Sequence, residues 1–135
     1  MSTAIIENQG LVTECFGCWP SFHDAEIDSI HLKRTEPGYW PTITLWLNVV
    51  GLAGAAGSKA KASRLWQLEL EFTEVIDNEF EGFNHQNVIF TLSFQQDHEE
   101  ITCLIDTSYG LSGSITARRV VVKTLTPISQ PFDAK

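Results

Sequence analysis

The residues best suited to chemistry lie in one short stretch, Cys-Trp-Pro-Ser-Phe-His-Asp-Ala-Glu-Ile, at positions 18–27. General acid–base catalysis uses groups such as its His23, Asp24 and Glu26, because imidazole titrates near neutral pH. In an extended segment, however, adjacent side chains such as those of His23 and Asp24 point to opposite sides. We favour the alternative interpretation, in which Asp24 caps a turn and His23 hydrogen-bonds to the backbone. The sequence alone keeps a catalytic or ligand-binding role for this trio open.

A second candidate for chemistry is the Cys-x-x-Cys pair formed by Cys15 and Cys18. Such a pair can bind zinc or exchange disulfides. Redox pairs usually open a helix, whose dipole lowers the thiol pKa, whereas this pair is expected at the end of one. A zinc site would need two more ligands, and only His23 is near in sequence. We therefore predict partly buried thiols, no metal, no cofactor and no catalytic residue.

Three further residues are candidate binding groups. Trp46 is out of phase with the aliphatic face of its predicted strand, so it is either an exposed interface residue or covered by the helix. Trp19 can line a binding face or, together with Phe22, anchor the turn in the core. Asn84 can contact a ligand, although asparagine beside a strand start is mostly a turn residue. The predicted binding residues are Trp19, His23, Asp24, Glu26, Trp46 and Asn84.

Alternating apolar residues predict the strands that must position these groups. A short helix is expected over residues 5–16, with Gly17 as its C-terminal cap. The first strand needs a bulge near Asp28 to keep its apolar residues in phase. In the fourth strand, Phe90 and Leu92 are expected to face the core. The predicted strands cover residues 26–33, 42–50, 65–75, 87–94, 101–107 and 114–123.

The order of these elements predicts one α+β domain over residues 1–135 that is mainly β. We expect a single antiparallel meander sheet of about six strands with one short N-terminal helix. Residues 51–63 are rich in glycine, alanine and serine, and are expected to form a flexible loop. Residues 77–86 are expected to connect two strands and fold back onto the core, and residues 126–135 to form a tail.

Composition restricts the partners of the protein. The formal net charge of the 135-residue chain is −8, which argues against nucleic acid, because phosphates need clustered lysine and arginine. The acidic run from Glu69 to Glu81 is either a solvated face or a surface for a basic partner. No apolar run reaches the ~20 residues of a membrane helix, and the N-terminus lacks a secretory signal. Three cysteines are an odd count, which favours a reduced, cytoplasmic protein.

Three short motifs resemble those of a known family. They are Trp-Pro-x-Phe-His-Asp-Ala-Glu at 19–26, Phe-Asn-x-x-Asn-Val-Ile at 83–89 and Gly-x-x-Gly at 110–113. This pattern, spread over residues 16–122, resembles a family of small bacterial domains grouped among the immunity proteins of polymorphic-toxin systems. The resemblance implies a neutralising binder without catalysis. It assigns no binding residue, and the loop 51–63 has no counterpart in the pattern.

The leading hypothesis is therefore a non-catalytic protein-binding domain, an immunity-type inhibitor of a bacterial toxin. The alternative is a small enzyme or ligand-binding domain with its site around His23, Asp24 and Glu26. A third class, a structural or oligomerisation domain that uses an exposed sheet face, leaves homo-oligomer formation open. The expected partner is a toxin protein, with no nucleic acid and no membrane.

Overall fold

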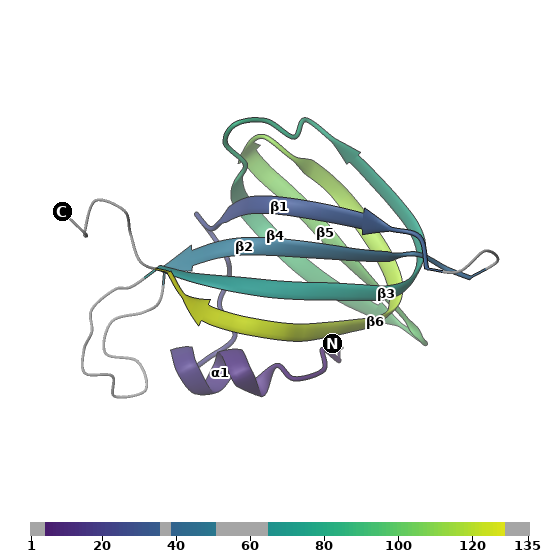
Figure 1. The fold of residues 1–135 in the computed structure, drawn as a ribbon, viewed down its shortest axis with the longest axis horizontal. Coiled ribbons are helices and arrows are strands. Elements are labelled where there is room, and N and C mark those ends of the chain that lie inside the picture. The colour runs from purple at the N-terminus through teal and green to yellow at the C-terminus, as the bar shows by residue number, and fades with distance from the viewer. Residues whose placement is uncertain (1–4, 36–38, 51–64, 129–135) are drawn as a thin grey trace.

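The computed structural model describes residues 5–35, 39–50 and 65–128, and the expected flexible loop 51–63 lies outside them. One helix is followed by six strands (Figure 1). The elements are α1 (Gly10–Phe16), β1 (Glu26–Lys33), β2 (Thr42–Val50), β3 (Leu65–Glu81), β4 (Val88–Asp97), β5 (Glu100–Tyr109) and β6 (Ser112–Pro127). The predicted bounds of β1 and β2 are confirmed. β6 continues into the expected tail, most of which lies outside the described residues.

The six strands form a closed antiparallel barrel in the order β1-β2-β3-β6-β5-β4 (Figure 1). The predicted class, mainly β with one short helix, is confirmed. The strand order departs from a simple meander, because β3 pairs with β6 rather than with β4, and β4 instead closes the barrel against β1. The physical reason is length: β3 has 17 residues and β6 has 16, whereas β4 has 10. Only β6 can satisfy the backbone groups along the whole of β3.

β3 is longer than its alternation predicted. The sequence pattern ended this strand at Val75 and assigned residues 77–86 to a connection. In the structure, a register shift between Val75 and Asp77 lets the strand continue to its last residue, Glu81. The bulge keeps an apolar residue, Phe80, packed against the core. Residues 82–87 remain as the connection to β4, and their Phe83 is exposed rather than folded back.

The interior of the barrel is the hydrophobic core. Inward residues of β2 and β3, such as Leu45 and Leu70, are fully buried, as the alternation predicts. The prediction for β4 was wrong at one residue, Phe90. A register shift between Ile89 and Thr91 puts Ile89 into the core and leaves Phe90 51% exposed. A shift of one residue reverses the face to which each side chain points, so Phe90 becomes part of the surface.

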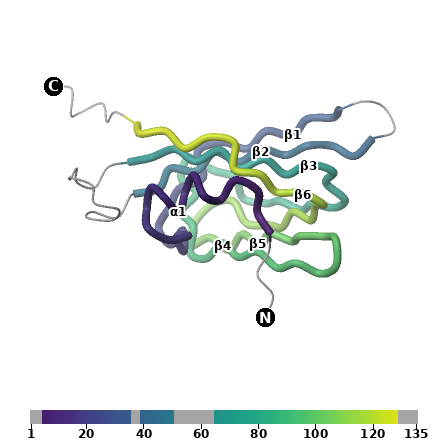
Figure 2. The backbone as a smooth tube through the Cα atoms, turned by 90° about the horizontal axis from the view of Figure 1, so that it is seen from below, coloured from purple at the N-terminus to yellow at the C-terminus, as the bar shows by residue number. Residues whose placement is uncertain are grey.

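α1 is shorter than the helix expected over residues 5–16. It ends as predicted at Gly17, whose φ of 86° lies in the left-handed region and whose N–H donates to the Thr13 carbonyl oxygen at 2.8 Å. Figure 2 shows α1 on the outside of the barrel beside β6. The ring of Phe16 packs edge-on against Trp66, with centroids 5.9 Å apart. Within the described part of the chain, no helix is long and apolar enough to cross a membrane.

The segment before α1 lies along β6 instead of being helical. The Glu7 N–H donates to the Val120 carbonyl oxygen at 2.8 Å, and the Val122 N–H donates to the Glu7 carbonyl oxygen at 2.9 Å. The Arg119 guanidinium also donates to both carboxylate oxygens of Glu7, at 2.8 and 2.7 Å. This hydrogen bonding lowers the pKa of Glu7 from its ordinary value, and the positive charge of Arg119 adds to the effect.

Candidate binding surface at the barrel seam

The barrel closes where the chain after α1 meets the start of β4, a junction that we call the seam (residues 22–27 and 87–90). β1 and β4 share a single residue pair, Glu26 with Val88. Three backbone hydrogen bonds complete the closure. The Asp24 N–H donates to the Ile89 carbonyl oxygen at 2.9 Å, and the Ile89 N–H donates to the Ala25 carbonyl oxygen at 2.8 Å. The Ile27 N–H donates to the backbone carbonyl oxygen of Asn87 at 2.9 Å. The stretch that contains His23, Asp24 and Glu26 therefore closes the barrel.

Two aromatic side chains anchor this stretch. Phe22 is buried, and its ring lies edge-on to Trp19 with centroids 5.4 Å apart. Trp19 is half-buried and also packs edge-on against Phe94, at 6.2 Å. The expectation that both rings anchor the turn is confirmed for Phe22 and holds in part for Trp19. The contacts of Trp19 with Phe22 and Phe94 are packing contacts. A binding role for the exposed part of its ring stays a prediction.

The turn that carries His23 is strained. Phe22 has φ 65° and Asp24 has φ 73°, both in the left-handed region although neither is glycine. For a bulky residue such as Phe22 this conformation costs roughly 1–2 kcal/mol. The Ala25 N–H donates to the Phe22 carbonyl oxygen at 3.0 Å and closes the turn. The seam hydrogen bonds and the burial of Phe22 offset the strain, and the turn presents His23 and Asp24 to solvent.

His23 is held by a backbone contact, as we expected. Its Nδ1 lies 3.0 Å from the Phe90 carbonyl oxygen. A carbonyl oxygen cannot donate, so Nδ1 carries the proton and Nε2 faces outward. Nε2 is 3.7 Å from the Asp24 carboxylate. The His23 ring also lies edge-on to the ring of Phe90, with centroids 5.5 Å apart. These contacts fix the orientation of the imidazole.

The carboxylates at the seam take different positions. The side chain of Asp24 is 78% exposed and makes no hydrogen bond within the described residues. The interpretation that Asp24 caps a turn through its side chain is therefore wrong; its backbone conformation, rather than its carboxylate, shapes the turn. Glu26 is half-buried at the start of β1. The structure thus brings His23 and Asp24 together at the surface.

The loop on the other side of the seam is organised by one buried amide, that of Asn87, which is 3% exposed. Its Oδ1 accepts from the backbone N–H groups of Asn84 and Leu111, both at 2.9 Å. Its Nδ2 donates to the carbonyl oxygens of Asn84 at 3.1 Å and Ile27 at 3.4 Å. A Cβ at Gly110 would collide with the Gln86 carbonyl oxygen, so only glycine fits there. The sequence pattern placed Asn87 at the start of the fourth strand and did not predict this role.

Asn84 is exposed on this loop, and its backbone is fixed by Asn87. Its Oδ1 accepts from the His85 N–H at 2.8 Å. Of the predicted binding residues, His23, Asp24 and Glu26 thus belong to one segment of the seam, and Asn84 lies in the loop that leads into the other.

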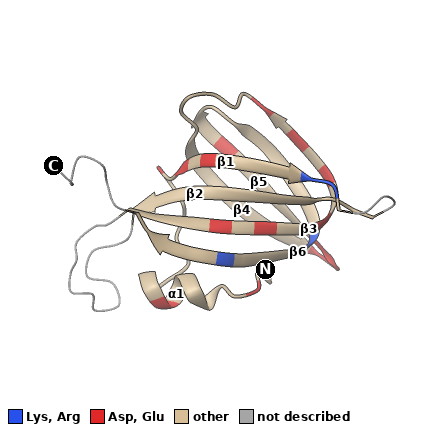
Figure 3. Ribbon diagram, in the orientation of Figure 1, with Lys and Arg blue, Asp and Glu red and all other residues tan. Residues whose placement is uncertain are grey.

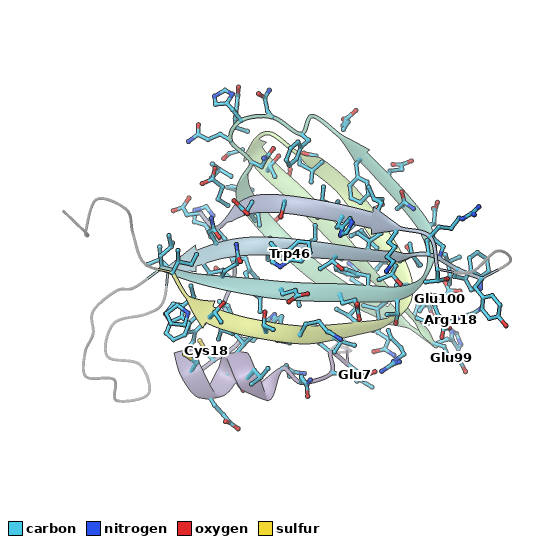
Figure 4. All side chains as sticks on the ribbon, viewed as in Figure 1. Glu7, Cys18, Trp46, Glu99, Glu100 and Arg118 are labelled. Carbon is cyan, nitrogen blue, oxygen red and sulfur yellow. The ribbon has the colours of Figure 1, made fainter. Side chains whose placement is uncertain are left out.

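Trp46 lies apart from these residues on the outer face of β2 (Figure 4). It is half-buried, pairs across the sheet with Ser29 and Glu69, and its ring lies 6.2 Å from that of His31. α1 sits beside β6, so the alternative that the helix covers Trp46 is wrong. Trp46 and His31 form a separate patch on the β1–β2–β3 face.

The thiols make no site with the seam. Cys18 is exposed near the end of α1 (Figure 4), Cys15 is half-buried and Cys103 is buried, and all three are free. Burial raises the pKa of the Cys15 thiol and raises that of Cys103 much further. Among the residues that the structure describes, no three histidine, cysteine or acidic side chains gather closely enough to hold a metal ion.

Comparison with known proteins gives one family. The Immunity protein 50 family matches residues 8–128, a range that includes α1, the six strands and both segments of the seam. No curated protein and no solved structure matches the chain.

Proposed function

Because the chain belongs to the Immunity protein 50 family, it is a toxin-neutralising binding protein rather than an enzyme, and we propose that it binds its toxin at the seam of the barrel. We also infer that the Trp-Pro-x-Phe-His-Asp-Ala-Glu motif at 19–26 is the element of the family that builds this surface. Neutralisation then consists of covering the toxin in a non-covalent complex. We place this complex in the cytoplasm, where three free cysteines remain reduced.

One observation carries the choice of the seam. The side chains of His23, Asp24 and Asn84 are exposed, whereas the backbone beneath them is fixed by the buried Phe22 and Asn87. A surface held in this way loses little conformational entropy on binding, which favours affinity. The left-handed conformation of Asp24 supports the same choice, because strained backbone is often retained where it serves function.

The alternative of a small enzyme at these residues has less support. The proton on His23 Nδ1 is committed to the Phe90 carbonyl oxygen. Nε2 lies 3.7 Å from Asp24, beyond the usual hydrogen-bond range, and both side chains are more than half exposed. The pair therefore lacks the short, oriented contact of a base and its partner. The same exposure suits contact with another protein.

The test uses a candidate toxin domain, sought among the genes next to that of this protein and prepared in a catalytically inactive form. The wild-type protein should protect cells from the active toxin and bind the inactive form, with light scattering reporting both complex stoichiometry and any homo-oligomer. Asp24→Asn should leave the melting temperature nearly unchanged, because the carboxylate is 78% exposed. It should weaken binding by about tenfold, the effect of losing one good polar contact.

The matched control is Glu99→Gln, which removes one exposed charge at the turn between β4 and β5 (Figure 4). It should bind like the wild type. Equal affinities for Asp24→Asn and Glu99→Gln would place the interface elsewhere on the barrel. A wild-type protein that neither binds nor protects against the toxin would refute the proposed pairing itself.

A further inference from the structure

Three exposed aromatic side chains surround the seam end of the barrel, and we call them the aromatic end: Phe83, Phe90 and Tyr109. They are 53%, 51% and 46% exposed. Each comes from a different segment: the 82–87 loop, β4 and the end of β5. Val88, two residues before Phe90, pairs directly with Tyr109. Aromatic rings left in water on one end of a small domain indicate an interaction surface.

Histidines lie edge-on to two of these rings. His85 lies 5.7 Å from Tyr109, and His23 lies 5.5 Å from Phe90, measured between ring centroids. Both aromatic rings remain about half exposed in these contacts. His23 also belongs to the seam surface, so the aromatic end and the proposed toxin-binding surface are continuous.

The last part of β3 leads into the aromatic end and is acidic. Asp77, Glu79 and Glu81 are exposed, and in the register with β6 they face Thr116, Ser114 and Ser112. Glu81 ends the strand two residues before Phe83. A Cβ on the intervening Gly82 would lie 2.7 Å from the Gly110 carbonyl oxygen, so the end of β3 touches the turn after Tyr109.

Two acids earlier in β3 differ, because basic residues of β6 pair with them. Lys123 lies 3.6 Å from Glu71, and Arg118 lies 3.7 Å from Glu74. In contrast, neither β4, β5 nor residues 112–117 of β6 contain a lysine or arginine. Figure 3 shows the acidic residues along the end of β3 with no basic residue beside them on that strand. The charge at this end is therefore left for a partner to neutralise.

A hollow of about 390 Å³ lies beside these carboxylates. Its lining residues are Glu79, Phe80, Glu81, Ser112 and Gly113. A Cβ at Gly113 would collide with the Glu79 carbonyl oxygen, so glycine allows the two strands to approach closely here. The hollow offers carboxylate oxygens, a hydroxyl group and an aromatic residue, which together suit an arginine or lysine side chain.

We propose that the toxin docks through a basic surface, whose arginine or lysine side chains meet Glu79 and Glu81 while apolar parts pack on the aromatic end. This inference rests on the proposed function, since it names the chemistry of the partner at the same end of the barrel. Opposite charges accelerate association, and buried aromatic rings slow dissociation. The two contributions can therefore be separated kinetically.

The test measures association and dissociation of the inactive toxin domain on the immobilised full-length protein. The charge-reversal variant Glu79→Lys/Glu81→Lys should lower the association rate by about tenfold or more at low ionic strength. For the wild type, the association rate should fall steeply between about 50 and about 500 mM NaCl, because salt screens the attraction. Tyr109→Ala should instead raise the dissociation rate, by about tenfold.

The matched control is Glu99→Lys/Glu100→Lys, at the opposite end of the β4–β5 hairpin beside Arg118 (Figure 4). It changes the net charge by the same amount, so a loss confined to Glu79→Lys/Glu81→Lys is due to position. Circular dichroism shows whether Glu79→Lys/Glu81→Lys is folded. If the lysines disturb folding, the variant Glu79→Gln/Glu81→Gln tests the same inference by removing the two charges.

The outcomes separate the two proposals. A wild-type complex that forms independently of salt, or that tolerates Glu79→Lys/Glu81→Lys as well as the control, overturns the basic-partner inference and leaves toxin binding intact. A wild-type protein that does not bind the toxin domain refutes the proposed function, and this inference with it.

Discussion

Replacing Asn87 with alanine should loosen the seam and the loop that it joins. The variant removes the one acceptor that serves the N–H groups of Leu111 and Asn84. Leu111 is 2% exposed, so water cannot easily replace the lost acceptor, and an orphaned buried N–H costs about 1–3 kcal/mol. Asn84 is exposed and can bond to water. The variant also removes the Nδ2 group that donates to the carbonyl oxygens of Asn84 and Ile27. Together, these losses should decrease the free energy of unfolding by about 2–4 kcal/mol.

Guanidinium unfolding followed by tryptophan fluorescence measures this loss, because the chain has four tryptophans. Asn84→Ala is the control, since its exposed side chain hydrogen-bonds, within the described part of the chain, only to its neighbour His85 and should contribute less than about 1 kcal/mol. Amide hydrogen exchange shows where the structure loosens: the amides of Leu111 and Ile27 should lose the most protection from exchange. A decrease below about 0.5 kcal/mol, with the Leu111 amide still protected, would refute the view that Asn87 holds the loop.

Two other predictions concern the thiols and pH. In the native protein Ellman's reagent should react rapidly with the exposed Cys18 and not with Cys103, which should react only after unfolding; rapid native reaction at Cys103 would contradict its burial. The lowered pKa of Glu7 means that its ion pair stabilises the fold above the ordinary carboxyl pKa of 4.5, and this stabilisation is lost as the pH falls through the lowered folded value. Between about pH 6 and about pH 3 the wild type should lose more stability than Glu7→Gln in denaturant titrations, and equal losses would count against the pairing.

Local patterns predicted the strands well and their pairing less well. The alternation located β1 and β2 to the residue, and the expected bulge appears as a register shift between Ile27 and Ser29. The β3–β6 ladder was not predictable, because no local pattern encodes which distant strands pair. The bulges after Val75 and at Phe90 were not predicted either. One extra residue reverses which side chains point inward, and alternation alone cannot locate the extra residue.

The candidate site was found for a reason that differs from its structural role. The density of aromatic and polar residues at 19–26 drew attention to the stretch, and the structure makes it the closure of the barrel. The importance of Asn87 was not visible in sequence, because its partners Leu111 and Ile27 are 24 and 60 residues away. A polar residue between a loop and an apolar strand was the only signal. Phe90 was missed because the predicted phase placed it inside.

The seam separates, at the level of single atoms, the groups that hold the fold from the groups that face solvent. The backbone of Asp24 closes the barrel through its N–H bond to the Ile89 carbonyl oxygen, whereas its carboxylate is exposed and, among the described residues, lies near His23. Changes beyond Cβ at Asp24 should therefore have little effect on the fold, since exposed side chains rarely contribute much stability. Changes at Phe22 or Asn87 should destabilise the protein, because those buried groups hold the turn and the loop. If the toxin binds where we propose, substitutions at the exposed atoms should change its affinity while the buried closure stays the same.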